Sequence, residues 1–401
     1  MKHSAIEDLD LTEFVTFNLK CIHFFGYFSP RFDKSSKRQF FYRLYAFTFV
    51  MFAFILSLLS QLAKMIESLD DIEKITDASF LLLTNFVQCI KILSFNFYRV
   101  KIWKLVDGMN RTSFKPRNVE QYEILLDGIK MSKLITKLFF IACVITCASW
   151  GISPLFDRDI DDSLHLPLSG WYPFSTEKSP GFEFAYVYQC FVTVVGGLGN
   201  ISMDTFMSGS IMVLSSQLSV LNNALRNIKD KHVSASAKKN QEELKNINRI
   251  LVECVNHHRN ILQFADDFTF LFTTSITGMF VVGVIIVCIS MFQMSLVPVA
   301  SFRFVAMLLY QICVLVEIYL WCYYGNDVIL KSDKLTESAY VCQWVNASEE
   351  FKHNLLYFMT RTQFPLKLYA SGYFTLSLDT FKAIVKSSWS YFAVLNQVHS
   401  S

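Results

Sequence analysis

The stretch Phe268–Phe292, FTFLFTTSITGMFVVGVIIVCISMF, contains no charged residue and decides the class of fold. As a helix rising ~1.5 Å per residue, it is long enough to cross a hydrocarbon core of ~30 Å. The buried cores of soluble proteins rarely need apolar runs of this length. The stretch therefore predicts a membrane-spanning helix.

Six further segments have the length and apolar character of a span, so we predict an all-α membrane protein with seven transmembrane helices. The composition agrees, because 52% of the 401 residues are hydrophobic and only 18% are charged. The predicted spans are Phe40–Ala63, Ala78–Tyr98, Leu134–Ile152, Phe184–Ile211, Phe268–Phe292, Val299–Tyr324 and Leu376–Val398.

The loops between these spans differ sharply in positive charge. Of the Lys and Arg residues, 27 fall in the N-terminal segment and in every second loop, whereas five fall in the other loops. Because Lys and Arg mark cytoplasmic loops, the N-terminus is predicted to be cytoplasmic and the C-terminus extracellular. This orientation is opposite to that of a G-protein-coupled receptor and argues against a metabotropic receptor.

Two amphipathic stretches follow the predicted fourth span on the cytoplasmic side. In the first, leucines recur at spacings of four, three and four, which is typical of one helix face. In the second, five aliphatic residues are predicted to share a face. The two sets are Leu214, Leu218, Leu221 and Leu225, and then Leu244, Ile247, Leu251, Val255 and Leu262.

Motifs for catalysis or metal binding are weak. Cys254, His257 and His258 offer too few ligands for structural zinc, which needs about four. The glycine-rich GGLGN at Gly196–Asn200 lies in an apolar helix without the strand or Lys of a phosphate loop, so it indicates close helix packing. We expect neither an enzyme, a metal, a cofactor nor a nucleic-acid partner.

Charged residues within spans are costly and therefore stand out. Asp204 lies near the inner end of its helix, where it is expected to reach water. Glu317 is deeper, and a packing contact and a role in conduction are both open. We single out five of them: Lys91, Asp204, Glu317, Lys382 and Lys386.

The last span carries two of these cations near its predicted cytoplasmic start. Lys382 and Lys386 share a helix face at i, i+4, where they either anchor the helix, with Asp379 as a partner, or line an inner vestibule. The outer half is uncharged and places four residues on one face. Around an axis formed by several copies, this face would make a gate that closes by dewetting. The four residues are Tyr391, Val394, Gln397 and Val398.

Two stretches resemble signatures of one family. SLDTFKAIVKSSWSYFAVLNQ, from Ser377, resembles the C-terminal motif of insect odorant receptors, and LPLSGWYPFSTEKSPGFEFAYVYQ, from Leu166, resembles their second exterior loop, which we predict to be a lid. The resemblance implies an odorant-gated, nonselective cation channel in the plasma membrane of sensory dendrites. It also implies a heterotetramer with the odorant co-receptor, with Val394, Val398 and Gln397 at the gate.

The same resemblance implies an odorant pocket between spans two, three, four and six. The chain departs from the co-receptor at Asn396 and Val398 and in its short second cytoplasmic loop, so it resembles an odorant-specific tuning subunit. A gustatory receptor and, further off, a secondary transporter using Asp204 and Glu317 remain alternatives. The implied pocket residues are Phe80, Leu83, Thr84, Thr146, Trp150, Met203, Met307 and Tyr310.

The domain organisation that follows has six parts. They are a cytoplasmic N-terminal segment (1–39), helices one to four of the ligand-binding bundle (40–216) with an extracellular lid loop (153–183), a cytoplasmic helical region (217–267), helices five and six (268–324), cytoplasmic anchor helices (325–375) and a pore-lining seventh helix with a short tail (376–401).

Overall fold

The computed structural model describes residues 9–31, 36–156, 166–176, 178–228, 237–345 and 347–400. These residues are almost entirely helical, and each predicted span coincides with a helix. The first span consists of α3 (Ser36–Val50), a five-residue π-helix η2 (Met51–Ile55) and α4 (Leu56–Glu67). The others lie in α5 (Ile72–Phe97), α7 (Val119–Phe156), α8 (Gly181–Arg226), α9 (Ala237–Leu296), α10 (Phe302–Tyr340) and α12 (Leu378–Ser400).

Within the described residues, six helices are long and apolar enough to span a membrane. The predicted seventh, α12, is more polar, because Asp379, Lys382 and Lys386 occupy its first half. Three helix starts are fixed by side-chain caps that satisfy free backbone N–H groups. Asp71 caps α5 and Ser301 caps α10, and Ser348 caps α11 (Glu349–Thr362).

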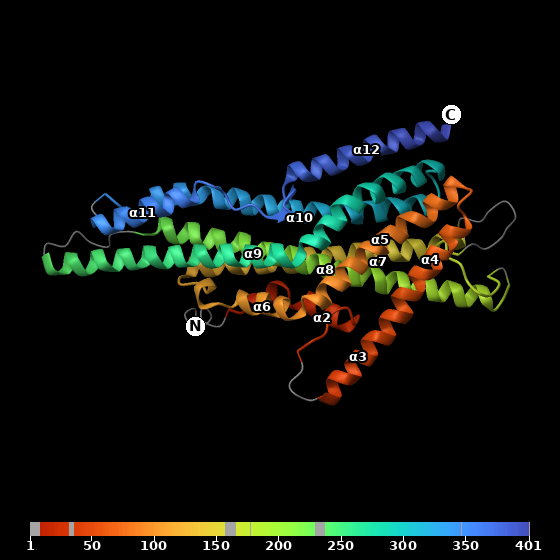
Figure 1. Ribbon diagram of the computed structural model, residues 1–401, viewed down its shortest axis with the longest axis horizontal. Coiled ribbons are helices and arrows are strands. Elements are labelled where there is room, and N and C mark those ends of the chain that lie inside the picture. The colour runs from red at the N-terminus through yellow and green to blue at the C-terminus, as the bar shows by residue number, and fades with distance from the viewer. Residues whose placement is uncertain are drawn as a thin grey trace.

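Four of the helices are far longer than a bilayer requires. α7 has 38 residues, α8 has 46, α9 has 60 and α10 has 39, against the ~20 that cross a membrane. They run along the long axis of the molecule, with α11 at one end and the C-terminus at the other (Figure 1). α7, α8, α9 and α10 therefore form both the membrane bundle and a helical layer on the predicted cytoplasmic side.

The leucine stripe of α8 is the core of that layer. Leu214, Leu218, Leu221 and Leu225 are all fully buried, which confirms the predicted face. Smaller elements pack around the long helices: η1 (Leu11–Phe14) and α2 (Thr16–Phe24) contact α8, and α6 (Arg99–Met109) and η3 (Thr112–Phe114) contact α9. A two-residue antiparallel pair, β1 (Tyr369–Ala370) and β2 (Phe374–Thr375), precedes α12 and was not predicted.

The predicted face of α9 is wrong in its second half. Ile247 and Leu251 are buried, but Val255 is 37% exposed, whereas Cys254 and Ile261 are buried. A stripe at alternating four- and three-residue spacing passes through Cys254 because a helix has 3.6 residues per turn. The side chain of Leu244 lies outside the described residues, and Leu262 is only half-buried.

The histidines beside Cys254 have structural partners. His257 Nε2 lies 2.8 Å from Gln217 Oε1 on α8, and the His258 ring packs edge-on against Phe358 of α11. No group of His, Cys, Asp or Glu in the described part of the chain is arranged to hold a metal ion. The histidines thus join α9 to its neighbours.

A ligand cavity within the helix bundle

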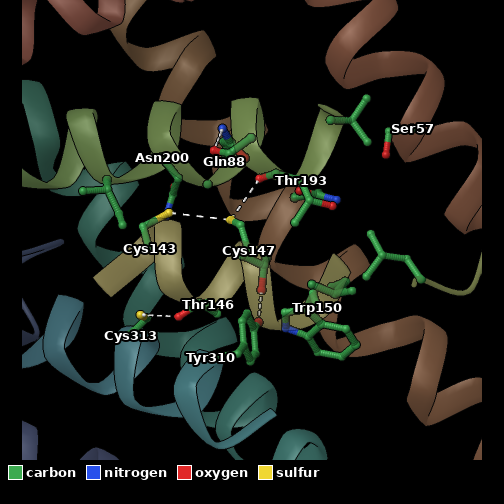
Figure 2. Close-up of a pocket in the computed structure, with 18 of the residues that line it drawn as sticks. Ser57, Gln88, Cys143, Thr146, Cys147, Trp150, Thr193, Asn200, Tyr310 and Cys313 are labelled. Carbon is green, nitrogen blue, oxygen red and sulfur yellow. Dashed lines mark hydrogen bonds between the residues drawn. The ribbon is translucent and has the colours of Figure 1, made fainter. Parts of the chain in front are cut away.

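A cavity of about 130 Å³ lies inside the bundle. Its walls come from η2, α4, α5, α7, α8 and α10, and from Leu168 of the loop before α8. Figure 2 shows side chains of α5, α7, α8 and α10 converging on it. Predominantly apolar walls with a few placed polar groups are typical of small-molecule sites.

Four of the eight residues predicted for the pocket line this cavity, namely Thr84, Thr146, Trp150 and Tyr310. Phe80 lies directly behind them, with its ring centroid 5.4 Å from that of Tyr310 and 5.9 Å from that of Trp150. The remaining three pack in the surrounding core and do not form the wall. They are Leu83, Met203 and Met307.

Hydrogen bonds within the wall fix the polar side chains. The hydroxyls of Thr84 and Tyr310 are 2.5 Å apart and join α5 to α10. Asn85 Nδ2 donates to Gln61 Oε1 over 2.9 Å, and Gln88 Nε2 donates to the Gly196 carbonyl over 3.0 Å. Gln61, Asn85 and Gln88 were not predicted from the sequence, although the i, i+3 spacing of the last two places them on one face of α5.

The GGLGN segment forms part of the same wall. A Cβ at Gly197 would lie 2.9 Å from Cys143 Sγ, and one at Gly199 would lie 2.2 Å from the Tyr27 ring. These contacts confirm the predicted close packing. Gly196 differs, because a Cβ there would have its nearest neighbour, Gln88 Oε1, only at 4.0 Å, and the position faces the cavity.

Three of the five charges singled out within spans meet at one end of the cavity. Lys91 Nζ donates to Asp204 Oδ1 and to Glu317 Oε1, both over 2.6 Å, and to Asn200 Oδ1 over 3.0 Å. The side chains of Lys91, Asp204 and Glu317 are 1%, 2% and 6% exposed. The expectation that Asp204 reaches water is therefore wrong, because its carboxylate is buried and paired with Lys91. We call these three residues the charge triad.

The triad touches the cavity through Glu317, and Asn200, which binds Lys91, also lines the cavity. The Lys91 ammonium also lies 5.4 Å from the centre of the Trp321 ring. Because a lone buried charge is costly in a membrane, this pairing explains how three charged residues are tolerated there. It also gives the cavity, whose other polar side chains are uncharged, one acidic side chain.

The loop before α8 contributes Leu168 to the cavity wall on the predicted outer side. Gln189 accepts a hydrogen bond from the Leu168 N–H over 3.0 Å and donates to the Leu168 carbonyl over 2.9 Å. Ser60 makes a similar pair with Trp171, because its carbonyl accepts from the Trp171 N–H and its hydroxyl donates to the Trp171 carbonyl. Residues 166–174, which we call the lid, are thus held to α4 and α8.

A third attachment joins the lid to α5 and α10. The Ser169 hydroxyl donates to Asp77 Oδ2, while Arg303 Nη2 lies 2.5 Å from Asp77 Oδ1. The predicted lid loop is therefore ordered in this part. Pro154, expected in the loop, instead lies in the last turn of α7, and residues 157–165 and 177 lie outside the described residues.

Replacing Gln189 by leucine is expected to loosen the lid. The change removes both hydrogen bonds to Leu168 at nearly constant volume, and two such bonds contribute roughly 1–3 kcal/mol. Hydrogen exchange of the peptide containing Leu168 should accelerate by about 10- to 100-fold. Exchange at Trp171, which Ser60 holds, provides the internal control; equal acceleration at both would contradict a specific role of Gln189.

The residues predicted for the gate lie together on α12. Tyr391, Val394 and Val398 are about 60% exposed (61%, 60% and 63%), and Gln397 is also exposed. Near the start of the helix, Lys382 pairs with Asp379 over 3.2 Å, and Lys386 is exposed. α12 packs against α9 and α10 through a neighbouring part of its surface, where Ile384 and Ser388 are buried.

Comparisons with known proteins agree with this architecture. The profile of the family described as 7tm Odorant receptor matches residues 71–389. The chain is 25% identical to Odorant receptor Or1 of Anopheles gambiae, over 95% of this chain and 94% of that protein. It is 26% identical to Odorant receptor 46a, isoform A, of Drosophila melanogaster, over 83% and 85% of the two chains.

Solved structures show the same fold. The insect olfactory receptor OR5 from Machilis hrabei in complex with eugenol superposes with a TM-score of 0.79, at 19% identity, over 97% of this chain and 98% of that chain. A second structure of that receptor gives a TM-score of 0.75 at 20% identity, over 95% and 97% of the two chains. This similarity confirms the prediction of a seven-helix membrane fold.

Proposed function

Because the chain belongs to the 7tm odorant receptor family, a family of multi-pass membrane receptors and not of enzymes, we propose that it is an odorant-specific tuning subunit of a ligand-gated cation channel. A small volatile molecule binds in the cavity between α5, α7, α8 and α10. The pore is tetrameric and nonselective, and α12 lines it. The partner subunits are copies of the odorant co-receptor, in the plasma membrane of a sensory dendrite.

The observation that carries this proposal is the cavity inside the bundle. The family resemblance predicts eight pocket residues, and four of them line one cavity: Thr84, Thr146, Trp150 and Tyr310. A receptor of the same fold, OR5 of Machilis hrabei, has been solved in complex with the small molecule eugenol. In this chain, the Trp150, Tyr310 and Phe139 rings would supply apolar contact to a volatile ligand.

The link from cavity to pore runs through α10. This helix contributes Tyr310, Val314 and Glu317 to the cavity and packs against α12 further along. A ligand that binds the open state more tightly shifts the closed–open equilibrium towards it. The exposed face of Tyr391, Val394, Gln397 and Val398 then moves away from the pore axis, while Asp379, Lys382 and Lys386 lie at the inner vestibule.

Co-expression in voltage-clamped cells tests the proposal. The chain is expressed with and without an odorant co-receptor, and volatile esters, alcohols, ketones and aromatics are applied. We expect a nonselective current with a reversal potential near zero only when both chains are present. Current from this chain alone would make it a self-sufficient channel, and responses to tastants but not to odorants would favour the gustatory alternative.

Replacing Gly196 by leucine is expected to abolish the odorant response. The Cβ position is open, so the added side chain extends into the cavity instead of into neighbouring backbone. Filling a cavity of about 130 Å³ with four carbons leaves little room for a ligand. Half-maximal concentrations should rise at least about 100-fold, as expected when several kcal/mol of contact are lost.

The control for this variant is Val194→Leu on the same helix, at a 40% exposed position outside the cavity. It should leave odorant responses unchanged. Surface labelling of both variants confirms equal amounts at the plasma membrane. Normal responses from the Gly196 variant would show that odorants bind elsewhere.

A further inference from the structure

The charge of the cavity wall is concentrated at one end. Among the described residues of the wall, Glu317 is the only Asp, Glu, Lys or Arg, and it lies beside Asn200. At the other end stand Trp150, Leu168 and the Thr84–Tyr310 pair. A molecule that fills this space therefore meets a carboxylate at one end and, along the rest, mostly apolar side chains with uncharged amides and hydroxyls among them.

The charged donor at this end of the cavity is already engaged. An ammonium has three N–H donors, and those of Lys91 are taken by Asn200, Asp204 and Glu317. The Asn200 amide donates to Glu317 Oε2 over 3.4 Å. The charged side chain that meets the cavity there, Glu317, is thus an acceptor.

The carboxylates, in contrast, have acceptor capacity to spare. An ionised carboxylate offers about four lone-pair sites. Glu317 Oε2 accepts one long bond, from Asn200, and Asp204 Oδ2 is buried with no hydrogen-bond partner within the described residues. Two carboxylates also share one ammonium, so the triad carries one more potential negative charge than positive charges.

We propose that the ligand is an apolar molecule with one hydrogen-bond donor, a hydroxyl or a protonated amine, and that Glu317 Oε2 accepts this hydrogen bond. The inference rests on the proposed odorant-receptor function and names its ligand class. A charged acceptor binds a donor more strongly than a neutral one does. An ester, ether or ketone oxygen at the same place would face the carboxylate without a proton between them.

The net charge of the triad determines whether a protonated amine or a hydroxyl binds more tightly. When both carboxylates are ionised, a protonated amine balances the extra negative charge. When one of them holds a proton, the site is neutral and a hydroxyl is the better match. Both cases share the same contact, and they differ in the order of potency of amine and alcohol.

Matched compounds test the contact. Alcohol, primary amine, methyl ether and hydrocarbon are prepared on the hexyl, octyl and 2-phenylethyl skeletons and applied to cells that express the chain with a co-receptor. For each skeleton, the more potent of the alcohol and the amine should have a half-maximal concentration at least about tenfold lower than that of the methyl ether. Glu317→Gln should reduce this preference to within about threefold, with little change for the ether.

Asp204→Asn is the matched control. It removes one carboxylate from the same triad but at a position that does not line the cavity. It should preserve the preference for alcohol over ether while weakening the amine, because only the charge has changed. If both variants impair every compound equally, Glu317 acts through the packing of the triad and the proposed contact is wrong.

The outcomes separate this inference from the proposed function. Ethers or hydrocarbons as potent as the alcohols in the unmodified chain would overturn the donor contact, yet the evoked current would still support an odorant receptor. Currents evoked only by donor-free members of the wider odorant panel would do the same. Absence of current for every compound, with both chains labelled at the surface, would count against the receptor function itself.

Discussion

Replacing Lys91 by methionine is expected to remove the protein from the cell surface. Methionine matches the length of the lysine stem, but Asp204 and Glu317 would then face each other in a buried site without a cation. Removing one partner of a buried ion pair costs about 3–5 kcal/mol. That energy lowers the folding equilibrium constant by roughly 150- to 5,000-fold, a large share of the ~5–15 kcal/mol that stabilises most folded proteins.

Surface labelling and thermal stability in detergent measure this effect. Lys130→Met is the control, because Lys130 and Asp127 form an exposed pair, 65% and 75% exposed, of the kind that contributes ~1 kcal/mol or less. A triple variant with Asp204→Asn and Glu317→Gln added should regain surface expression, since no unpaired charge remains. Wild-type expression of Lys91→Met alone would show that the carboxylates are protonated or hydrated.

Replacing Val394 by asparagine is expected to produce a large current without odorant. In the proposed tetramer, a ring of Val394 side chains closes the pore by excluding water, and an amide at each position would keep the constriction wet. Basal current should rise to a large fraction of the odorant-evoked current. Voltage clamp of cells expressing the variant with the co-receptor, before and after odorant, measures the ratio.

Val385→Asn gives a control on the same helix. Nine residues separate the two valines, so at about 100° per residue they lie on opposite faces of α12. Val385 is also exposed, at 37%, and the substitution is the same. Equal leak from both variants would point to general damage to α12, and no leak from Val394→Asn would argue against this face as the gate.

The lengths of the apolar runs were enough to predict the seven helices, because runs of this length are needed to cross a bilayer and are rare in other proteins. They were not enough to predict where the helices end. α8, α9 and α10 continue for many turns past their apolar parts, where polar and apolar residues alternate by face and burial depends on neighbours. The shift from Val255 to Cys254 on α9 has the same origin, since a small rotation of the helix decides which of two adjacent residues is buried.

Only part of the cavity could be predicted from the sequence, again because the rotation of each helix is not known from the sequence. Thr84, Thr146, Trp150 and Tyr310 follow from the family resemblance, which fixes the approximate turn of each helix. The charge triad does not, because Lys91, Asp204 and Glu317 lie on three helices far apart in the chain. In the sequence, each is a charged residue in a span without a visible partner. Only the rotation of α5, α8 and α10 about their axes brings the opposite charges to 2.6 Å from each other.

The hydrogen bonds that hold Leu168 and Trp171 reach their main-chain atoms and leave their side chains unconstrained. Leu168 is nevertheless one of the residues that form the cavity wall. If odorants bind as proposed, a single-codon change at this position would reshape the space available to them while keeping the hydrogen bonds that hold the loop. Receptors built in this way could acquire new odour preferences during evolution through side chains whose backbone is held independently.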